Sequence, residues 1–174
     1  MNGHYNYHVG QQIIYVYGQQ QFKRLFTANN LEEKSVGGDY LITSGIGAHK
    51  LHLRRLCWNK ARQVCVHEGG QLAVINSFSE EKILLRMLQE NNLTVAWLGI
   101  HDLYEEGDWV TVKGEPLGST GYTSWITLFG QYPQPNNGGG TEHCATLAIE
   151  GGRVGMNDLT CNAWNLPFFC EITV

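Results

Sequence analysis

Five side chains in the C-terminal half of the chain carry the oxygen atoms that a hard metal ion needs. They lie around one proline and in one later pair: Gln134, Asn136, Glu142, Asn157 and Asp158. Calcium takes roughly six to eight oxygen ligands from carboxylates, Asn or Gln carbonyls and backbone carbonyls. Amides can also donate hydrogen bonds through nitrogen, whereas carboxylates only accept them. The set therefore predicts a site for a hard cation such as calcium.

Sequence spacing alone does not bring residues 134–142 next to residues 157–158. A disulfide between Cys144 and Cys161 would do so, because it brackets the second group. The chain has five cysteines, with Cys57, Cys65 and Cys170 as the others. An even framework with one cysteine left over is typical of a secreted protein. The sequence by itself does not give the connectivity, and free buried thiols in a cytosolic protein are the alternative.

The elements that must position these residues are predicted from apolar periodicity and turn residues. A helix over about 56–68 places Trp58, Ala61 and Cys65 on one face and ends at two glycines. A second helix, over about 79–91, follows a capping box formed by Ser77 and Glu80. Its predicted buried face consists of Ile83, Leu84, Met87 and Leu88.

Short apolar runs predict strands at 72–75, 95–100, 109–112, 145–149 and 168–172. Residues 114–141 are rich in Gly, Pro and Asn and predict a long loop, which in a small domain is usually functional. Residues 1–45 differ from the rest and predict an N-terminal extension to a domain at 46–174. Within the extension, residues 13–17 predict a strand that pairs with another strand or a partner chain, and residues 27–46 predict a linker or an irregular surface segment.

Composition excludes several classes of function. The formal net charge is −4 and the isoelectric point is near 5.9, which argues against sequence-independent nucleic-acid binding. No apolar run approaches the roughly 20 residues that a membrane-spanning helix needs. No nucleophile motif, HExxH pair or phosphate loop is present, so we do not expect an enzyme. The first residues lack a secretion signal, which fits a mature chain whose signal has been removed.

Residues 45–172 resemble a C-type lectin domain. The residues that carry the resemblance are Trp58, Ala61, Cys65, residues 69–73, residues 97–100, Glu106-Gly107, residues 134–136, residues 142–144, Asn157-Asp158, Cys161 and residues 168–171. Residues 48–52 and 114–123 look most like insect hemolymph lipopolysaccharide-binding lectins of the immulectin type. The resemblance implies an α+β fold with two helices flanking small antiparallel sheets and a long calcium- and sugar-binding loop. It also implies disulfides Cys65–Cys170 and Cys144–Cys161.

For the site, the resemblance implies that the five oxygen-bearing residues ligate one Ca²⁺, whose shell two sugar hydroxyls complete. It implies a cis bond before Pro135. A weaker second calcium site would use Asp102, Glu106 and Asn137, although His143 stands where another acid is usual. Gln134 and Asn136 share one feature each with galactose-type and mannose-type motifs, so they favour mannose-type sugars only slightly. With Met156 where a tryptophan is usual, packing under the loop is expected to change.

The predicted function is that of a secreted, extracellular pattern-recognition lectin that binds microbial glycans, including lipopolysaccharide, through Ca²⁺. Cys57 is either a free thiol or a link between two chains, and Cys57 or the N-terminal segment would support a homo-oligomer. Asn92 begins a sequence for N-glycosylation. The alternative function is a calcium-independent module of the same fold that binds a protein, because the fold does not fix the ligand.

Overall fold

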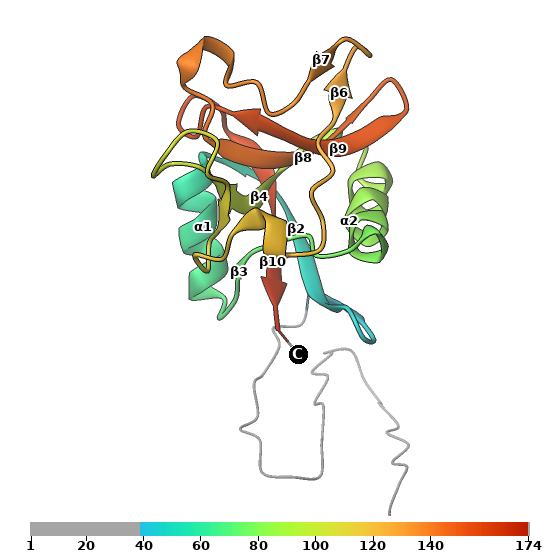
Figure 1. Ribbon diagram of the computed structural model, residues 1–174. Coiled ribbons are helices and arrows are strands. Elements are labelled where there is room, and N and C mark those ends of the chain that lie inside the picture. Colours follow the sequence, from blue (N-terminus) through green and yellow to red (C-terminus); the bar gives the residue numbers. More distant parts are fainter. Residues whose placement is uncertain (1–38, 174) are drawn as a thin grey trace, which may run out of the picture. The chain divides into compact units, whose positions relative to one another are not determined.

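A computed structural model describes residues 39–173, which form two α-helices and a central mixed sheet (Figure 1). The predicted strand at residues 13–17 lies outside the described residues. The elements in chain order are β1 (Leu41–Thr43), β2 (Gly47–Leu56), α1 (Trp58–His67), β3 (Gln71–Leu72), α2 (Phe78–Glu90), β4 (Val95–His101), β5 (Val110–Thr111), η1 (Leu117–Ser119), β6 (Thr127–Leu128), β7 (Tyr132–Pro133), η2 (Gly138–Gly140), β8 (Cys144–Glu150), β9 (Arg153–Leu159) and β10 (Leu166–Ile172).

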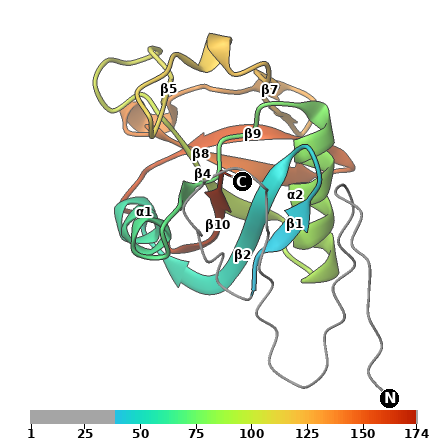
Figure 2. The same cartoon turned by 90° about the horizontal axis from the view of Figure 1, so that it is seen from below.

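The main sheet has the strand order β1-β2-β10-β4-β8-β9, with β3 added to β10 and β5 added to β4. Its pairs are antiparallel except for β10 and β4, which run parallel. The strands β6 and β7 form a separate antiparallel pair within the long loop. Helices α1 and α2 lie on opposite sides of the central strands, as both views show (Figures 1 and 2). The α+β prediction is therefore confirmed.

The first helix forms as predicted, because its apolar residues share one face. Trp58, Ala61 and Cys65 are buried on α1, and Gly69 has a left-handed φ of 83° just after the helix end. The N–H of Gly70 then bonds the carbonyl of Cys65 at 2.9 Å. These contacts satisfy carbonyls that the end of the helix would otherwise leave unpaired.

The second helix confirms half of the predicted capping box. The Ser77 hydroxyl accepts the Glu80 N–H at 3.2 Å, as a cap should. The Glu80 carboxylate does not return to Ser77, and that part of the prediction is wrong. Instead it accepts the Asn76 N–H at 2.8 Å and pairs with His49 at 2.7 Å. Glu80 is only 1 % exposed. Its carboxylate thus forms a buried, long-range contact with His49 of β2 in place of a local contact with Ser77.

The prediction of an irregular segment over residues 27–46 is wrong where the structure describes it. Leu41 to Thr43 form β1, which pairs with β2 through Leu41–His49, Ile42–Ala48 and Thr43–Gly47. Gly45, with a φ of 75°, allows the tight turn between the two strands. The predicted division between residues 45 and 46 stays a prediction.

Two disulfides hold the strands and helices together, and both are those that the resemblance implied. Cys65–Cys170 joins α1 to β10 across a sequence separation of 105 residues. Cys144–Cys161 joins the start of β8 to the segment after β9 across 17 residues. Cys57 is a free cysteine in this chain and is half-buried. The second disulfide fixes the start of β8 next to the end of β9, at the end of the hairpin that lies next to the long loop.

Candidate calcium and ligand site

The hairpin of β8 and β9 places the later pair of predicted ligands beside the earlier segment. Antiparallel pairing sets Asp158 opposite Ala145 and Asn157 opposite Thr146. The Cys144–Cys161 disulfide closes the same end of the hairpin. Both of these predicted ligands are buried, at 8 % exposure for Asn157 and 1 % for Asp158. The structure therefore places residues 157–158 at the end of the hairpin where β8 begins, close in sequence to Glu142.

The long loop is held on this edge by the Asp158 carboxylate. The backbone N–H of Asn136 donates to its two oxygens at 3.2 and 3.1 Å, and the N–H of Asn137 donates at 2.7 Å. The peptide bond between Gln134 and Pro135 is cis, as the resemblance implied. These contacts fix the proline segment against β9, so residues far apart in the sequence share one site.

Gly138 leaves room for side-chain oxygens of both Asn136 and Glu142. A Cβ at Gly138 would lie 2.7 Å from Glu142 Oε2 and 3.4 Å from Asn136 Oδ1. The space that a side chain would occupy is thus bordered by two of the predicted ligands. The Gly138 N–H donates to Glu142 Oε2 at 2.8 Å, which orients that carboxylate. Sequence reasoning missed this role, for which the run of three glycines at 138–140 was the available signal.

The electrostatics of this cluster favour a cation. Burial raises the pKa of Glu142, and the negative charge of Asp158 raises it further, while the Gly138 N–H acts in the opposite direction. Two carboxylates that disfavour each other's charge are both stabilised by a positive ion between them. The donor set is oxygen only, which is the set that calcium prefers over softer metals.

Gln134 supplies the most specific sign that the site fits a metal. Its side chain is 8 % exposed, and its Oε1 atom is buried with no hydrogen-bond partner among the described residues. A buried carbonyl oxygen without a partner is costly. A metal ion would satisfy it. The N–H of Asn136 contacts Asp158, which follows Asn157 on β9, and the Gly138 N–H contacts Glu142. The predicted oxygen ligands thus belong to segments that hydrogen bonds hold together, and the residues present fit a calcium ion.

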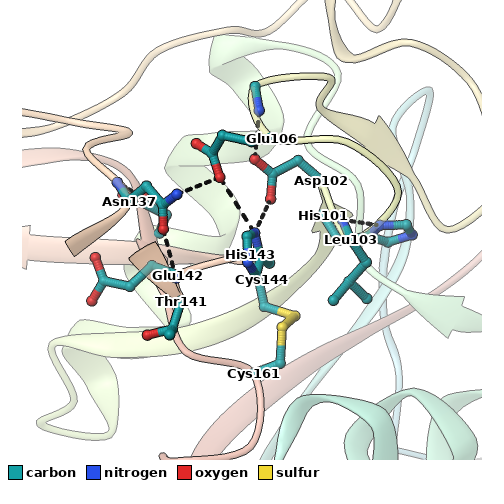
Figure 3. Close-up of polar contacts among 12 residues, drawn as sticks. His101, Asp102, Leu103, Glu106, Asn137, Thr141, Glu142, His143, Cys144 and Cys161 are labelled. Carbon is teal, nitrogen blue, oxygen red and sulfur yellow. Dashed lines mark hydrogen bonds and ion pairs between the residues drawn. A yellow bond between two sulfur atoms is a disulfide. The ribbon is translucent and has the colours of Figure 1, made fainter. Parts of the chain in front are cut away.

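The predicted second site also comes together, but with a competing side chain (Figure 3). Ligand atoms of Asp102, Glu106 and His143 all lie within 4.8 Å of one another. His143 Nδ1 contacts Asp102 Oδ1 at 3.1 Å and Glu106 Oε2 at 3.5 Å. The buried Asp102 also accepts the Gly107 N–H at 2.8 Å. The imidazole therefore takes coordination capacity that a calcium ion would need.

Asn137 connects the second cluster to the first. Its Nδ2 donates to Glu106 Oε2 at 2.5 Å, while its Oδ1 accepts the Glu142 N–H at 3.1 Å (Figure 3). Asn137 adopts a left-handed φ of 46°, which Asn tolerates better than most residues. Because both ends of its amide already have partners, Asn137 is better placed to join the two clusters than to ligate an ion.

Comparison with known proteins decides the family. The Lectin C-type domain model matches residues 54–172. The chain belongs to the C-type lectin family. This membership confirms the resemblance on which the site was predicted. It also bears out the prediction that the chain is not an enzyme, since members of this family are non-enzymatic.

This C-type lectin domain is similar to proteins of different kinds. The "Hemolymph lipopolysaccharide-binding protein" of Periplaneta americana is 36 % identical over 145 residues, which cover 79 % of this chain and 54 % of that protein. The chain thus spans about half the length of that relative. The carbohydrate-recognition domain of the mouse scavenger receptor C-type lectin is 25 % identical, with a TM-score of 0.64 over 79 % of this chain and 95 % of that one.

The fold is shared by proteins with and without a need for calcium. A calcium-independent type II antifreeze protein aligns with a TM-score of 0.60 at 19 % identity, over 87 % of this chain and 96 % of that one. At that identity the likeness shows the fold alone. The question of calcium in this C-type lectin domain therefore rests on its own residues.

Proposed function

We propose that this domain binds glycans in a calcium-dependent way through Gln134, Asn136, Glu142, Asn157 and Asp158. The observation that carries the proposal is the buried Oε1 of Gln134, which has no hydrogen-bond partner in the part of the chain that the structure describes. Similarity to a protein named for lipopolysaccharide binding supports a glycan as the ligand. We therefore propose microbial surface glycans, including lipopolysaccharide, as the targets.

The amide and carboxylate side chains of the proposed site have different hydrogen-bonding roles. When bound, calcium would supply coordination positions for neighbouring sugar hydroxyls. The amides of Gln134 and Asn136 can donate to hydroxyls as well as accept from them, whereas Glu142 and Asp158 can only accept. Amides stand on both sides of Pro135, so the sequence enforces no single order of hydrogen-bond donor and acceptor. The expected preference for mannose-type hydroxyls is therefore only slight.

Affinity for calcium is expected to be low. Only Glu142 and Asp158 carry negative charge in the set, and extracellular calcium modules with few charges bind at roughly 10⁻⁴–10⁻³ M. A single sugar site of this kind is also weak, so useful binding would need several sites on one assembly. We propose that Cys57 or the N-terminal segment supports such a homo-oligomer.

We further propose that the protein is secreted and acts outside the cell in innate recognition. Two disulfides fit an oxidising compartment. Among the described residues, no helix is long and apolar enough to cross a membrane.

Asn92 is exposed in the turn after α2, so its sequon is accessible for N-glycosylation. Treatment of the secreted protein with a glycosidase that removes N-glycans should lower its mass, and the Asn92→Gln variant should show no change.

A calcium-independent, protein-binding module is the second candidate. The observation that favours it is His143, which contacts both acids of the second cluster and so lowers the number of ions the domain can hold. In this case the long loop would contact a protein directly, without an ion. Binding that a chelator does not affect would support this alternative.

Retention on immobilised mannose, galactose and lipopolysaccharide, in millimolar calcium and again with chelator, tests the proposal. We expect retention in calcium and elution by chelator. The Asp158→Ala variant should not be retained, while Asp108→Ala, a change at an exposed acid outside the site, should behave like the unchanged protein. Retention of Asp158→Ala would contradict the assigned ligands.

A further inference from the structure

A second surface of the long loop has exposed aromatic side chains that the calcium site does not use. Phe129 is 75 % exposed and Tyr132 is 57 % exposed. Both belong to the β6–β7 hairpin, and their rings meet edge to face with centroids 6.4 Å apart. Tyr132 pairs with Leu128 across the hairpin. Two large rings are thus held side by side in solvent.

The tip of this hairpin is folded in a way that a phenylalanine disfavours. Phe129 has a φ of 48° and Gly130 has a φ of 71°, and the Gln131 N–H bonds the carbonyl of Leu128 at 3.0 Å. Two successive left-handed residues form the tight turn for which Asn-Gly is preferred. A bulky side chain there is a conformational outlier. Such strain, combined with an exposed apolar ring, points to a function other than stability.

The hairpin is anchored to charged residues on either side of the turn between β8 and β9. The Phe129 N–H donates to Glu150 Oε2 at 2.9 Å, and Arg153 Nη1 donates to the Thr127 carbonyl at 3.4 Å. Glu150 and Arg153 face each other across the β8–β9 turn. A Cβ at Gly130 would lie only 3.2 Å from the guanidinium, so glycine leaves that group room against the turn.

Together these residues border a hollow of about 470 Å³, lined by Phe129, Gly130, Glu150, Gly151 and Arg153. The hollow combines an aromatic face, a carboxylate and an exposed guanidinium. A sugar ring has an apolar C–H face that can lie on an aromatic ring, and its hydroxyls can donate to a carboxylate. A guanidinium binds phosphate or carboxylate groups with paired hydrogen bonds.

We propose that this hollow is a second glycan subsite, which binds a sugar residue that carries a phosphate or carboxylate group. The inference rests on the proposed glycan binding and names a feature of its target. Phe129 precedes Gln134 by five residues, so an extended chain of that length spans at most about 18 Å. One oligosaccharide of a few residues can therefore reach both the calcium site and the hollow.

The test uses the full chain and lipopolysaccharide that retains its phosphates as the probe. Two variants remove contacts of the hollow, Phe129→Ala and Arg153→Gln, and a third, Tyr132→Ala, removes the ring that packs against Phe129. Each should weaken binding to lipopolysaccharide by roughly fivefold to tenfold, about 1–1.4 kcal/mol, while calcium-dependent retention on the simple sugar matrix stays unchanged. Phe78→Ala and Arg86→Gln remove an aromatic ring and a guanidinium of similar exposure elsewhere, and should change neither.

Two comparisons sharpen the outcome. Removal of phosphates from the lipopolysaccharide should abolish the effect of Arg153→Gln if phosphate is the bound group, and an effect that persists assigns a carboxylate. Unchanged lipopolysaccharide binding in all three variants would overturn the subsite and leave the calcium site standing. If the unchanged protein shows no calcium-dependent retention on any of the matrices, the proposed function is overturned, together with the subsite that rests on it.

Discussion

The Asp158 carboxylate accepts the backbone N–H of Asn137 at 2.7 Å, and this bond ties the long loop to β9. The same carboxylate also accepts the N–H of Asn136. Asp158 therefore both shapes the loop and stands among the predicted calcium ligands. A variant at this position removes both effects, so a cleaner separation of metal binding from folding has to come from another residue.

Gln134→Leu provides that separation. Leucine has a similar size and removes the buried Oε1 that has no partner among the described residues. In chelator, the free energy of unfolding should be unchanged or raised by about 1 kcal/mol, because an unsatisfied polar atom disappears. In calcium, the stabilisation seen for the unchanged protein should be largely lost. Denaturant titration with and without calcium measures both quantities.

Gln89→Leu is the matched control, since Gln89 is exposed on α2. It should keep the full stabilisation by calcium. If Gln134→Leu destabilises the protein in chelator by several kcal/mol, its amide has a structural partner, and the assignment of Oε1 as a metal ligand is wrong.

The second cluster should respond to changes in charge. Glu106 is about half exposed and contacts Asn137 and His143. Glu106→Gln keeps its shape and removes its charge, so binding of any second calcium ion should weaken. His143→Glu replaces the competing imidazole with an acid and should strengthen that binding by roughly tenfold, as ligand charge tunes affinity.

Calorimetric titration with calcium gives the number of ions and their affinities for both variants. Glu105→Gln, at the adjacent exposed acid, should leave the titration unchanged. If His143→Glu binds no more calcium than the unchanged protein, the cluster is a structural network and not a metal site.

Cys57 lies at the N-terminus of α1, where a side chain that accepts a hydrogen bond would stabilise the helix. It occupies the N-cap of α1, and its side chain makes no capping hydrogen bond. A serine hydroxyl can accept a bond from the first turn, so Cys57→Ser should stabilise the reduced monomer by about 0.5–1 kcal/mol. The denaturant midpoint measures this change. Electrophoresis without reductant should show a covalent dimer only for the unchanged protein if Cys57 links two chains.

Glu68 should make stability depend on pH. Burial raises the pKa of Glu68, but hydrogen bonds from Tyr40 and His52 and the charge of Lys50 outweigh it, so the pKa lies below its ordinary value of 4.5. The stabilisation is therefore fully present above about pH 4.5 and is lost as the pH falls through the lowered pKa.

Glu68→Gln should cost about 1 kcal/mol at pH 7, and the difference from the unchanged protein should shrink as the pH falls below 4.5. Glu90→Gln, which removes an exposed pair with Arg86, should cost only a few tenths of a kcal/mol. A Glu68→Gln difference that is constant from pH 7 to pH 3 would contradict the lowered pKa.

The sequence predicted the elements with strong apolar periodicity. Both helices and the strands around residues 95–100, 145–149 and 168–172 lie where the patterns placed them. It did not predict β2, which buries His49 and also carries Lys50 and two arginines, or β9, which carries two of the predicted polar ligands. Polar residues that are buried through long-range partners hide the alternation on which strand prediction depends.

The candidate site was predictable as a set of residues but not as a geometry. The oxygen-bearing side chains and the disulfide that joins them were named from the sequence and the resemblance. The N–H bonds to Asp158, the space at Gly138 and the link through Asn137 depend on how the loop folds over β9. Such contacts join segments that sequence spacing cannot relate.

The most direct test is a two-step calorimetric titration of the full chain. Calcium is first titrated into the metal-free protein, and the sugar that retains it best is then titrated into the metal-free and the calcium-loaded forms. We predict calcium uptake that Gln134→Leu largely loses, and a heat of sugar binding only in the loaded form. Sugar binding of equal strength in both forms, or no uptake of calcium, would contradict calcium-dependent glycan binding.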